Sequence, residues 1–114
     1  MAECLFCRIA TGEVPATIVH QDDLVLAIRD IAPRAPTHIL LIPRAHIGST
    51  ADLTAGDGPM LGRLFEVAAR VARDEGIAEQ GYRLVSNVGR WAGQTVEHLH
   101  VHLLGGRPFT WPPG

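Results

Sequence analysis

The sequence predicts an α+β fold, with a mainly antiparallel five-stranded sheet, one long helix and a short N-terminal helix. Short runs of alternating apolar and polar residues, separated by turns of hairpin length, are typical of antiparallel strands. One longer stretch, 61–72, instead carries apolar residues at helical spacing. The chain has 114 residues, 46% of them hydrophobic, which suits a single domain over 1–114 with one modest core.

The first half of the chain is predicted to hold the short helix and three strands. The helix covers 4–11 and ends at Gly12, because glycine is the usual residue just past a helix C-terminus. Residues 21–23 form a turn, and residues 30–36 contain two prolines and are expected to be irregular. Pro43 ends the last of these strands. The three strands are expected over 17–20, 24–29 and 38–42.

The second half is predicted to hold the long helix and two strands. Asp57, Gly58 and Pro59 form a helix start, with a capping residue and a proline near the first position. Gly76 ends the helix. Its apolar stripe consists of Leu61, Leu64, Phe65, Ala68, Val71 and Ala72. The two strands are expected over 82–87 and 96–104, with a glycine-bearing loop over 88–95 between them.

Charge and hydropathy exclude several classes of partner and of chemistry. The formal net charge of −2 argues against nucleic acid and against anionic membranes. The longest apolar run, 39–43, is too short to cross a bilayer, and residues 1–4 show no signal peptide. All ten basic residues are arginine, which excludes lysine nucleophiles and Schiff bases. We therefore expect a cytoplasmic protein that binds substrate anions through local groups.

Three of the six histidines lie within the segment His98-Leu99-His100-Val101-His102. On a strand, neighbouring side chains point to opposite faces, so the histidines would line one face about 6.6 Å apart, and the apolar residues would line the other. A helix would put only His98 and His102 on a common face. Three imidazoles on one wall can bind a metal ion, attack phosphorus, or both. The alternative is three solvated histidines on an edge strand.

Cys4 and Cys7 form a C-x-x-C pair near the start of the chain. A thioredoxin-type redox pair normally follows a strand, whereas only three residues precede this one. A disulfide is not expected in a cytosolic chain. The spacing leaves two interpretations open: half of a zinc site completed by two histidines, or a pair of ordinary buried thiols.

Other polar positions are ambiguous when each is taken alone. Asp30 lies beside apolar residues and is expected to order the loop that follows it. His20 has no companion motif and is expected to be at the surface or hydrogen-bonded. Asn87 is consistent with a turn. A glycine-bearing tripeptide can present N–H groups and a hydroxyl to an anion, and this one is Gly93-Gln94-Thr95.

Together, these motifs resemble those of the histidine triad superfamily. The motifs occur in the order C-x-x-C, D-I-x-P-x-x-P-T-H, I-P-R-x-H, N-x-G-x-x-A-G-Q and H-φ-H-φ-H-φ-φ. The segment Leu104-Gly105-Gly106-Arg107 and the tail Trp111-Pro112-Pro113-Gly114 resemble its nucleotide-binding (HINT-like) branch. The resemblance covers residues 4–114, and it implies a HIT-like fold.

The resemblance implies that His100 is a nucleophile. This residue would attack the α-phosphorus of a nucleotide and form a nucleotidyl-imidazole that water then hydrolyses. Imidazole suits this role because an unperturbed imidazole, with a pKa of about 6.5, is mostly neutral at pH 7. The resemblance also implies that the His98 carbonyl holds the protonated nitrogen of His100. His102 would contact the phosphate, and His38 would aid proton movement.

The resemblance further implies a nucleotide-binding site. Asp30 would accept hydrogen bonds from both ribose hydroxyls, and Asn87 would face the phosphate or the ribose. Gln94 and Thr95, beside Gly93, would bind the α-phosphate and the leaving group. Four apolar residues would form a slot for the base with modest base selectivity. They are Ile9, Ile28, Ile31 and Leu40.

A structural zinc ion and a homodimer are also implied by the resemblance. The zinc ligands would be Cys4, Cys7, His46 and His98, and four protein ligands make a closed site that stabilises the fold. Two chains would pair edge to edge into one continuous sheet, with the tail 111–114 of each reaching toward the other's active site.

The implied activity is hydrolysis of purine nucleoside 5′-phosphoramidates, of the AMP-NH2 or adenylyl-lysine type, through a nucleotidyl-histidine intermediate. One alternative is a dinucleoside polyphosphate hydrolase, a branch that lacks the Trp-Pro-Pro-Gly tail. Another is a nucleotide- or zinc-binding interaction module with incidental activity. A third is a zinc hydrolase whose catalytic metal is held by the three clustered histidines. Trp91 and Glu97 depart from the family pattern and bear on leaving-group preference.

Overall fold

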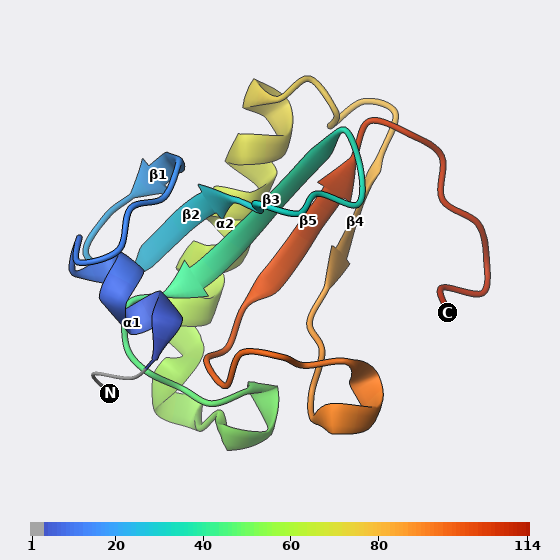
Figure 1. The fold of residues 1–114 in the computed structure, drawn as a ribbon. Helices are drawn as coiled ribbons and strands as arrows, with labels where there is room; N and C mark the ends of the chain where they lie inside the picture. Colours follow the sequence, from blue (N-terminus) through green and yellow to red (C-terminus); the bar gives the residue numbers. More distant parts are fainter. Residues whose placement is uncertain (1–3) are drawn as a thin grey trace.

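The computed structural model describes residues 4–114. The prediction made for residues 1–4 falls largely on residues 1–3, which lie outside the described part. The described chain forms one five-stranded sheet in the order β1-β2-β3-β5-β4 (Figure 1). The elements are α1 (Leu5–Ala10), β1 (Ile18–Gln21), β2 (Val25–Arg29), β3 (Thr37–Pro43), α2 (Gly58–Asp74), β4 (Tyr82–Val85) and β5 (Val101–Gly105). Short 3-10 turns occur at η1 (Thr50–Asp52), η2 (Ala55–Asp57) and η3 (Arg90–Ala92).

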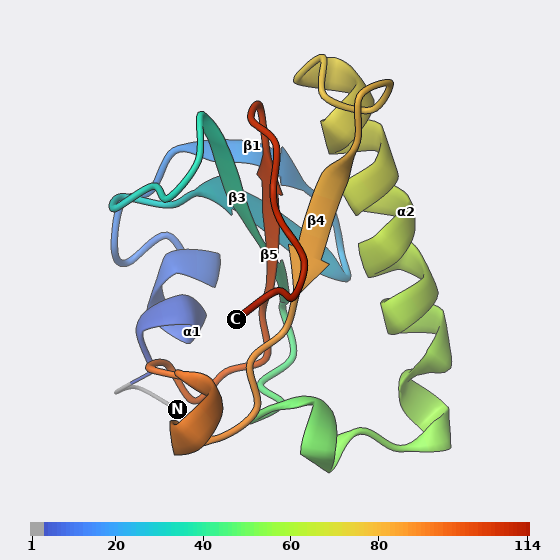
Figure 2. The same cartoon turned by 90° about the vertical axis from the view of Figure 1, so that its right-hand side faces the viewer.

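All neighbouring strands of the sheet are antiparallel, which confirms the predicted fold class. β3 lies at the centre between β2 and β5, and each of its seven residues is buried. The helices lie on opposite faces, with α2 along one and α1 against the other (Figure 2). Because helices cover both faces, β3 reads as a continuous apolar run rather than as an alternating strand.

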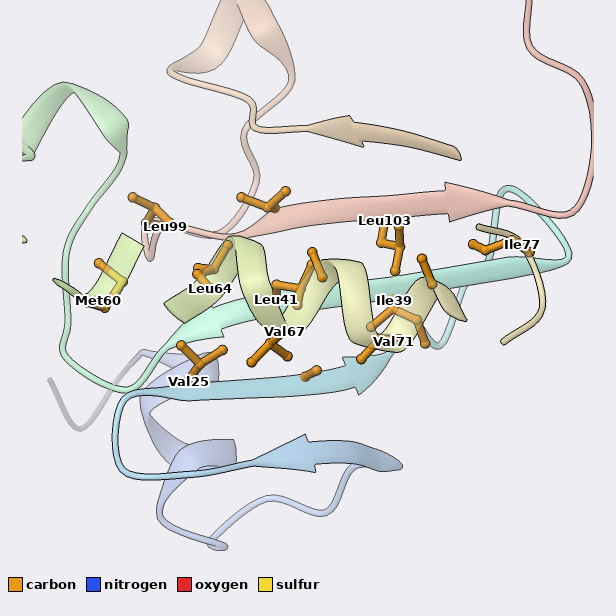
Figure 3. Packing of buried hydrophobic residues seen from close by; sticks show 14 residues of the cluster. Val25, Ile39, Leu41, Met60, Leu64, Val67, Val71, Ile77, Leu99 and Leu103 are labelled. Carbon is orange, nitrogen blue, oxygen red and sulfur yellow. The ribbon is translucent and has the colours of Figure 1, made fainter. Parts of the chain in front are cut away.

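α2 packs one face of the sheet into the larger core (Figure 3). Its buried residues Leu64, Val67 and Val71 are spaced three and four positions apart, so they form one stripe along the helix. They meet side chains that point down from three neighbouring strands. Those strand residues are Val25, Ala27, Ile39, Leu41, Val101 and Leu103.

A smaller apolar cluster lies on the opposite face, beneath α1. Its buried members are Phe6, Ile9, Leu26, Ile28, Leu40 and Ile42. α1 has only six residues, too few to be stable alone, so tertiary contacts must hold it. One such contact is from Arg44, whose Nη1 donates to the Ala10 carbonyl at 2.9 Å. This cluster positions the floor of the site described below.

The prediction of a strand over 96–104 is wrong in its first half, because β5 begins at Val101. Pairing with β3 ends at the Leu41–Val101 step, and the Leu99 N–H donates instead to the Ile47 carbonyl at 2.6 Å. The alternation of faces is nevertheless confirmed, since Leu99 lies in the α2-side core beside Val101. β4 likewise ends at Val85, two residues before the expected boundary at 87.

Asp57 precedes α2 as expected, but its side chain does not cap that helix. The carboxylate accepts hydrogen bonds from the Thr54 N–H at 2.9 Å and from the Thr54 hydroxyl at 3.2 Å. It therefore closes a capping box around η2, the turn that leads into α2. Within residues 4–114, no helix combines the length and the apolar character needed to span a bilayer.

Candidate active site and metal centre

A cavity of about 370 Å³ opens on the α1 side of the sheet. Its lining is mostly apolar, and its polar members include Asp30, Thr95, His100 and His102. This size and this mixture are typical of small-ligand sites. Two residues of the histidine triad, His100 and His102, line this cavity.

All four residues expected to form the base slot line this cavity. Ile9, Ile28 and Leu40 are buried, so they form its fixed floor. Ile31 differs, because it is 100% exposed at the rim. A ligand in the cavity would therefore cover Ile31 and remove its side chain from water.

Phe6 also lines the cavity, and the sequence reasoning did not single it out. Its ring meets the His100 ring edge-on, with centroids 5.1 Å apart, and is itself buried. Phe6 and Ile9 are three residues apart on α1, so a helical wheel of that segment would have placed both on the sheet-facing side.

Asp30 combines the two roles considered for it from sequence. Its Oδ1 accepts a hydrogen bond from the Ala32 N–H at 2.8 Å, so the carboxylate does order the loop that follows β2. Its Oδ2 lies 3.4 Å from His38 Nε2. The residue also lines the cavity, and a carboxylate has lone pairs to spare for a ligand's hydroxyl groups.

His100 is held by the carbonyl of His98, at 2.7 Å from His100 Nδ1. A carbonyl can only accept, so Nδ1 carries the proton and Nε2 keeps its lone pair. The expected contact between these two residues is therefore present. His100 lines the cavity, so the bare nitrogen belongs to a ring that faces the ligand space.

His102 and His38 form a second pair, with His102 Nδ1 2.9 Å from His38 Nε2. Burial lowers the pKa of His102 to about 4, and the neighbouring His100 and His38 act in the same direction. Burial likewise lowers the pKa of His38, against the opposing effect of Asp30. Both rings are therefore neutral at pH 7.

The loop after β4 places only one of its expected ligand-binding residues at the cavity, Thr95. The Gln94 side chain is used within the protein: its Oε1 accepts from the Gly89 N–H at 2.9 Å, and its Nε2 donates to the Gly48 carbonyl at 2.8 Å. Gln94 thus links two loops. Asn87 and Gly93 do not line the cavity in this structure.

Four potential metal ligands gather beside the cavity: Cys4, Cys7, His46 and His98, with ligand atoms within 4.8 Å of one another. His98 Nδ1 lies 3.3 Å from Cys4 Sγ and 3.5 Å from Cys7 Sγ. His46 Nδ1 lies 3.3 Å from Cys7 Sγ. Zinc–ligand bond lengths in a tetrahedral site require sulfur–nitrogen separations of about 3.6 Å, so this group already fits zinc closely.

The tautomer of His98 also fits a metal ligand. His98 Nε2 donates to the Pro43 carbonyl at 2.8 Å, which leaves the Nδ1 lone pair directed at the two sulfur atoms. The side chain is completely buried, and burial lowers its pKa, so the ring is in the neutral form that binds metals. Burial and the adjacent Cys4 raise the pKa of the Cys7 thiol, a cost that a bound dication would remove.

Comparison with known proteins agrees with this geometry. Residues 11–109 match the family model described as "HIT domain". The chain belongs to the HIT domain family. A curated HIT relative, the purine nucleoside phosphoramidase of Escherichia coli K12, is 55% identical over 107 residues, covering 94% of this chain and 90% of the relative.

Two further HIT relatives bear on the metal centre and on the fold. The "14 kDa zinc-binding protein" of Brassica juncea is 46% identical over 114 residues, covering 98% of this chain and all of the relative. The crystal structure of a HIT family hydrolase from Legionella pneumophila superposes with a TM-score of 0.96 at 53% identity, covering 98% of this chain and 100% of that one. The HIT fold expected from the motifs is thereby confirmed.

Proposed function

We propose that this HIT protein hydrolyses purine nucleoside 5′-phosphoramidates, of the AMP-NH2 or adenylyl-lysine type, through a nucleotidyl-histidine intermediate on His100. The observation that carries the proposal is the 2.7 Å hydrogen bond from His100 Nδ1 to the His98 carbonyl, which leaves Nε2 free to attack. The 55% identity to a purine nucleoside phosphoramidase supports the substrate class.

The proposed substrate enters the cavity base first. The purine lies against Ile9, Ile28 and Leu40, and its contact is apolar, so adenine and guanine are discriminated only modestly. The carboxylate of Asp30 accepts the ribose hydroxyls. This placement brings the α-phosphate to the polar lining of the cavity, between Thr95 and the two histidines.

In the first step, the His100 Nε2 lone pair forms a bond to phosphorus as the substrate's own P–N bond breaks. The leaving nitrogen takes up one proton from the solvent and departs as a free amine. His102 contacts a phosphate oxygen during this step, and His38 supports it through the 2.9 Å contact with His102. The His98 carbonyl continues to accept from Nδ1–H, and it stabilises the positive charge that the ring gains on nucleotidylation.

In the second step, water attacks phosphorus and the bond to His100 breaks. The water gives up one proton, the nucleoside monophosphate leaves, and the imidazole returns to its starting state. The proton that water releases to the solvent in this step balances the one consumed in the first step. Imidazole is a good leaving group from phosphorus, so neither step requires a metal ion at the triad.

A structural zinc ion is part of the proposal, with Cys4, Cys7, His46 and His98 as its ligands. The support is the donor set, its spacing and the second-shell hydrogen bond from His98 to Pro43. The zinc ion would link α1 to the loop that leads into β5. No ligand position is left for a substrate, so zinc stabilises the fold rather than activating water.

We also propose a cytoplasmic homodimer, each chain being a single HIT domain over 1–114. Among the described strands, β4 pairs only with β5, so its outer edge offers free backbone groups. Phe65 on α2 is 48% exposed, Trp91 is 96% exposed and Trp111 is 83% exposed, which is unusual for large apolar residues. A reduced cysteine pair suits the reducing conditions of the cytoplasm.

Rapid quenching of the zinc-loaded enzyme with an AMP phosphoramidate tests the proposed mechanism. We expect a transient adenylylated peptide containing His100, detected by mass spectrometry, and its absence in His100→Ala. Release of AMP with no adenylylated peptide would contradict the covalent route. Faster cleavage of a dinucleoside polyphosphate than of the phosphoramidate would favour the other hydrolase branch. Immediate loss of turnover on chelation, before any unfolding, would favour a catalytic metal.

A further inference from the structure

The loop between β2 and β3 contacts the back of the catalytic histidines. The backbone N–H of Arg34 donates to His38 Nδ1 at 3.0 Å. His38 Nε2 in turn lies 2.9 Å from His102 Nδ1. The contact with His38 uses the backbone of Arg34 and not its side chain, so the residue type at this position does not reveal it.

These two contacts fix the direction of a hydrogen-bond chain. A backbone N–H can only donate, so His38 Nδ1 must be the acceptor, and the proton of the neutral ring is on Nε2. His38 Nε2–H then donates to His102 Nδ1. His102 in consequence carries its own proton on Nε2, the nitrogen left free for a ligand in the cavity.

We propose that the backbone N–H of Arg34 sets the tautomers of His38 and His102, so that His102 presents a hydrogen-bond donor, and not a lone pair, to the substrate's phosphate. The proposal rests on the proposed function for the role of the phosphate, although the tautomers themselves are independent of it. A donor at this point is what an anionic phosphate oxygen requires, whereas a lone pair there would repel it.

Arg107 is the positioning residue that holds this N–H in place. Its Nη2 donates to the Arg34 carbonyl at 3.0 Å, and its guanidinium stacks over the Phe109 ring at 4.3 Å. Gly106 allows the close approach: its φ is +90°, and a Cβ there would lie only 2.8 Å from Pro36 Cβ. The C-terminal segment thus fastens the loop over 30–36 from outside the cavity.

The same tautomer bears on metal binding at this end of the cavity. Asp30, His38 and His102 bring three ligand atoms within 4.8 Å of one another. His38 Nε2 carries a proton there, however, and cannot offer a lone pair while Arg34 donates to Nδ1. A metal ion is therefore directed to the cysteine cluster, where the His98 lone pair already faces the sulfur atoms.

Ring ¹⁵N NMR at pH 7.5 on the zinc-loaded protein tests the proposal directly, because protonated and bare imidazole nitrogens resonate in separate regions. In the unmodified protein we expect Nε2 of both His38 and His102 to be protonated. Arg34→Pro removes the N–H, so a second tautomer should appear for both rings. Arg34→Ala keeps the N–H and should keep the original tautomer.

Ala35→Pro is the matched control, because it adds the same ring to the same loop and leaves the Arg34 N–H in place. We expect Arg34→Pro to lower kcat on an AMP phosphoramidate by about fivefold, the effect of one neutral hydrogen bond on the tautomer balance, with Ala35→Pro lowering it much less. Arg107→Met tests the same link without a proline, and it should give the mixed tautomers of Arg34→Pro.

The proposal is overturned if His102 Nε2 is bare in the unmodified protein, or if folded Arg34→Pro and Arg107→Met both keep the original tautomers. Should Arg34→Pro fail to fold, Arg107→Met decides. The NMR result does not depend on catalysis. Fixed tautomers in a protein that leaves phosphoramidates intact would remove the proposed function and leave this hydrogen-bond chain standing.

Discussion

At the scale of single residues, backbone groups decide which nitrogen of each histidine is available. His98 donates from Nε2 to the Pro43 carbonyl, so its Nδ1 faces the cysteines. His100 donates from Nδ1 to the His98 carbonyl, so its Nε2 remains bare. Two histidines that are two positions apart thereby take opposite tautomers, one suited to scaffolding and the other to attack.

His100→Ala should lower kcat/KM on an AMP phosphoramidate by about 10⁴-fold or more, because the attacking nitrogen is lost. AMP binding should persist, since the base slot does not depend on that ring. Steady-state kinetics and calorimetric titration with AMP measure the two effects. If His100→Ala weakened AMP binding but left kcat at the value of the unmodified protein, His100 would have a binding role instead.

His102 should make the protein less stable in acid. Its pKa of about 4 in the folded protein lies below the ordinary 6.5, because it is buried near His100 and His38. Between these pH values the unfolded chain binds a proton that the folded one does not. The free energy of unfolding therefore falls as the pH drops from about 6.5 to about 4.

We expect His102→Gln to lose less stability on acidification than the unmodified protein, by at most about 3 kcal/mol. Urea denaturation of both proteins from pH 7.5 to pH 4.5 measures the difference. The other acid-sensitive groups are present in both proteins, so their contributions cancel in the difference between the two free energies of unfolding. Parallel curves would mean that His102 is not protonated on unfolding.

At the scale of elements, two helices of very different length stabilise the sheet by different means. α2 has 17 residues and buries a full stripe of side chains against the sheet. α1 has six residues, contributes two buried side chains, and is held at its N-terminus by the cysteines. Packing suffices for the first helix, whereas the second is too short to be stable alone and depends on contacts such as the hydrogen bond from Arg44 to the Ala10 carbonyl.

Leu64→Ala should lower the free energy of unfolding by about 2–5 kcal/mol, because Leu64 is completely buried between α2 and the sheet. Arg70→Ala, on the exposed side of the same helix, should change it by about 0.5 kcal/mol or less. Chemical denaturation measures both, and kcat per folded molecule should be unaffected in each. Equal losses in the two variants would contradict the packing described for this face.

Cys4→Ser should lower the zinc content and reduce the melting temperature by on the order of 10 °C, because α1 loses its link to the loop before β5. Arg8→Ala, an exposed change on the same helix, serves as the control. Metal analysis and calorimetry provide the readouts. A full zinc content in Cys4→Ser would remove that residue from the proposed ligand set.

At the scale of the whole molecule, the described sheet has two outer strands, β1 and β4, and the C-terminal segment contacts β4. The β4 edge is unpaired within the described chain, and the C-terminal residues run out past it (Figure 1). Arg83 on β4 donates to the Thr110 carbonyl at 3.0 Å and so ties the tail to this edge. In the proposed homodimer, we place the second copy at this β4 edge, where the tail also lies.

The dimer should have twice the 12.3 kDa mass of one chain at micromolar concentration, as measured by light scattering. A single species of 12 kDa would contradict it. Trp91 and Trp111 are the only tryptophans, so Trp91→Phe and Trp111→Phe report on each position separately. Each variant keeps one tryptophan. If that tryptophan becomes buried when two chains associate, we expect its fluorescence emission to shift to shorter wavelength.

Sequence patterns were informative wherever a local rule applied. Alternation around the triad correctly placed Leu99 and Val101 in the core, even though the strand itself begins five residues later than expected. The apolar stripe of α2 was only partly predicted: Leu64, Ala68, Val71 and Ala72 are buried as expected. Phe65 is instead 48% exposed, and Val67 takes its place against the sheet. The prediction that Asp57 caps α2 was wrong, because its carboxylate accepts hydrogen bonds from Thr54 in the preceding turn, η2.

The sequence by itself determined the fold class, the faces of its elements and the set of residue types that carry the chemistry, because these depend on periodicity and on motifs. Tertiary structure alone decided how those residues are used. Cys4 contacts His98, which lies 94 positions later in the chain. The Gln94 amide donates to the Gly48 carbonyl, and the Arg34 N–H donates to His38 Nδ1. Hydrogen bonds have a direction and a length, and only packed backbones bring donor and acceptor into register.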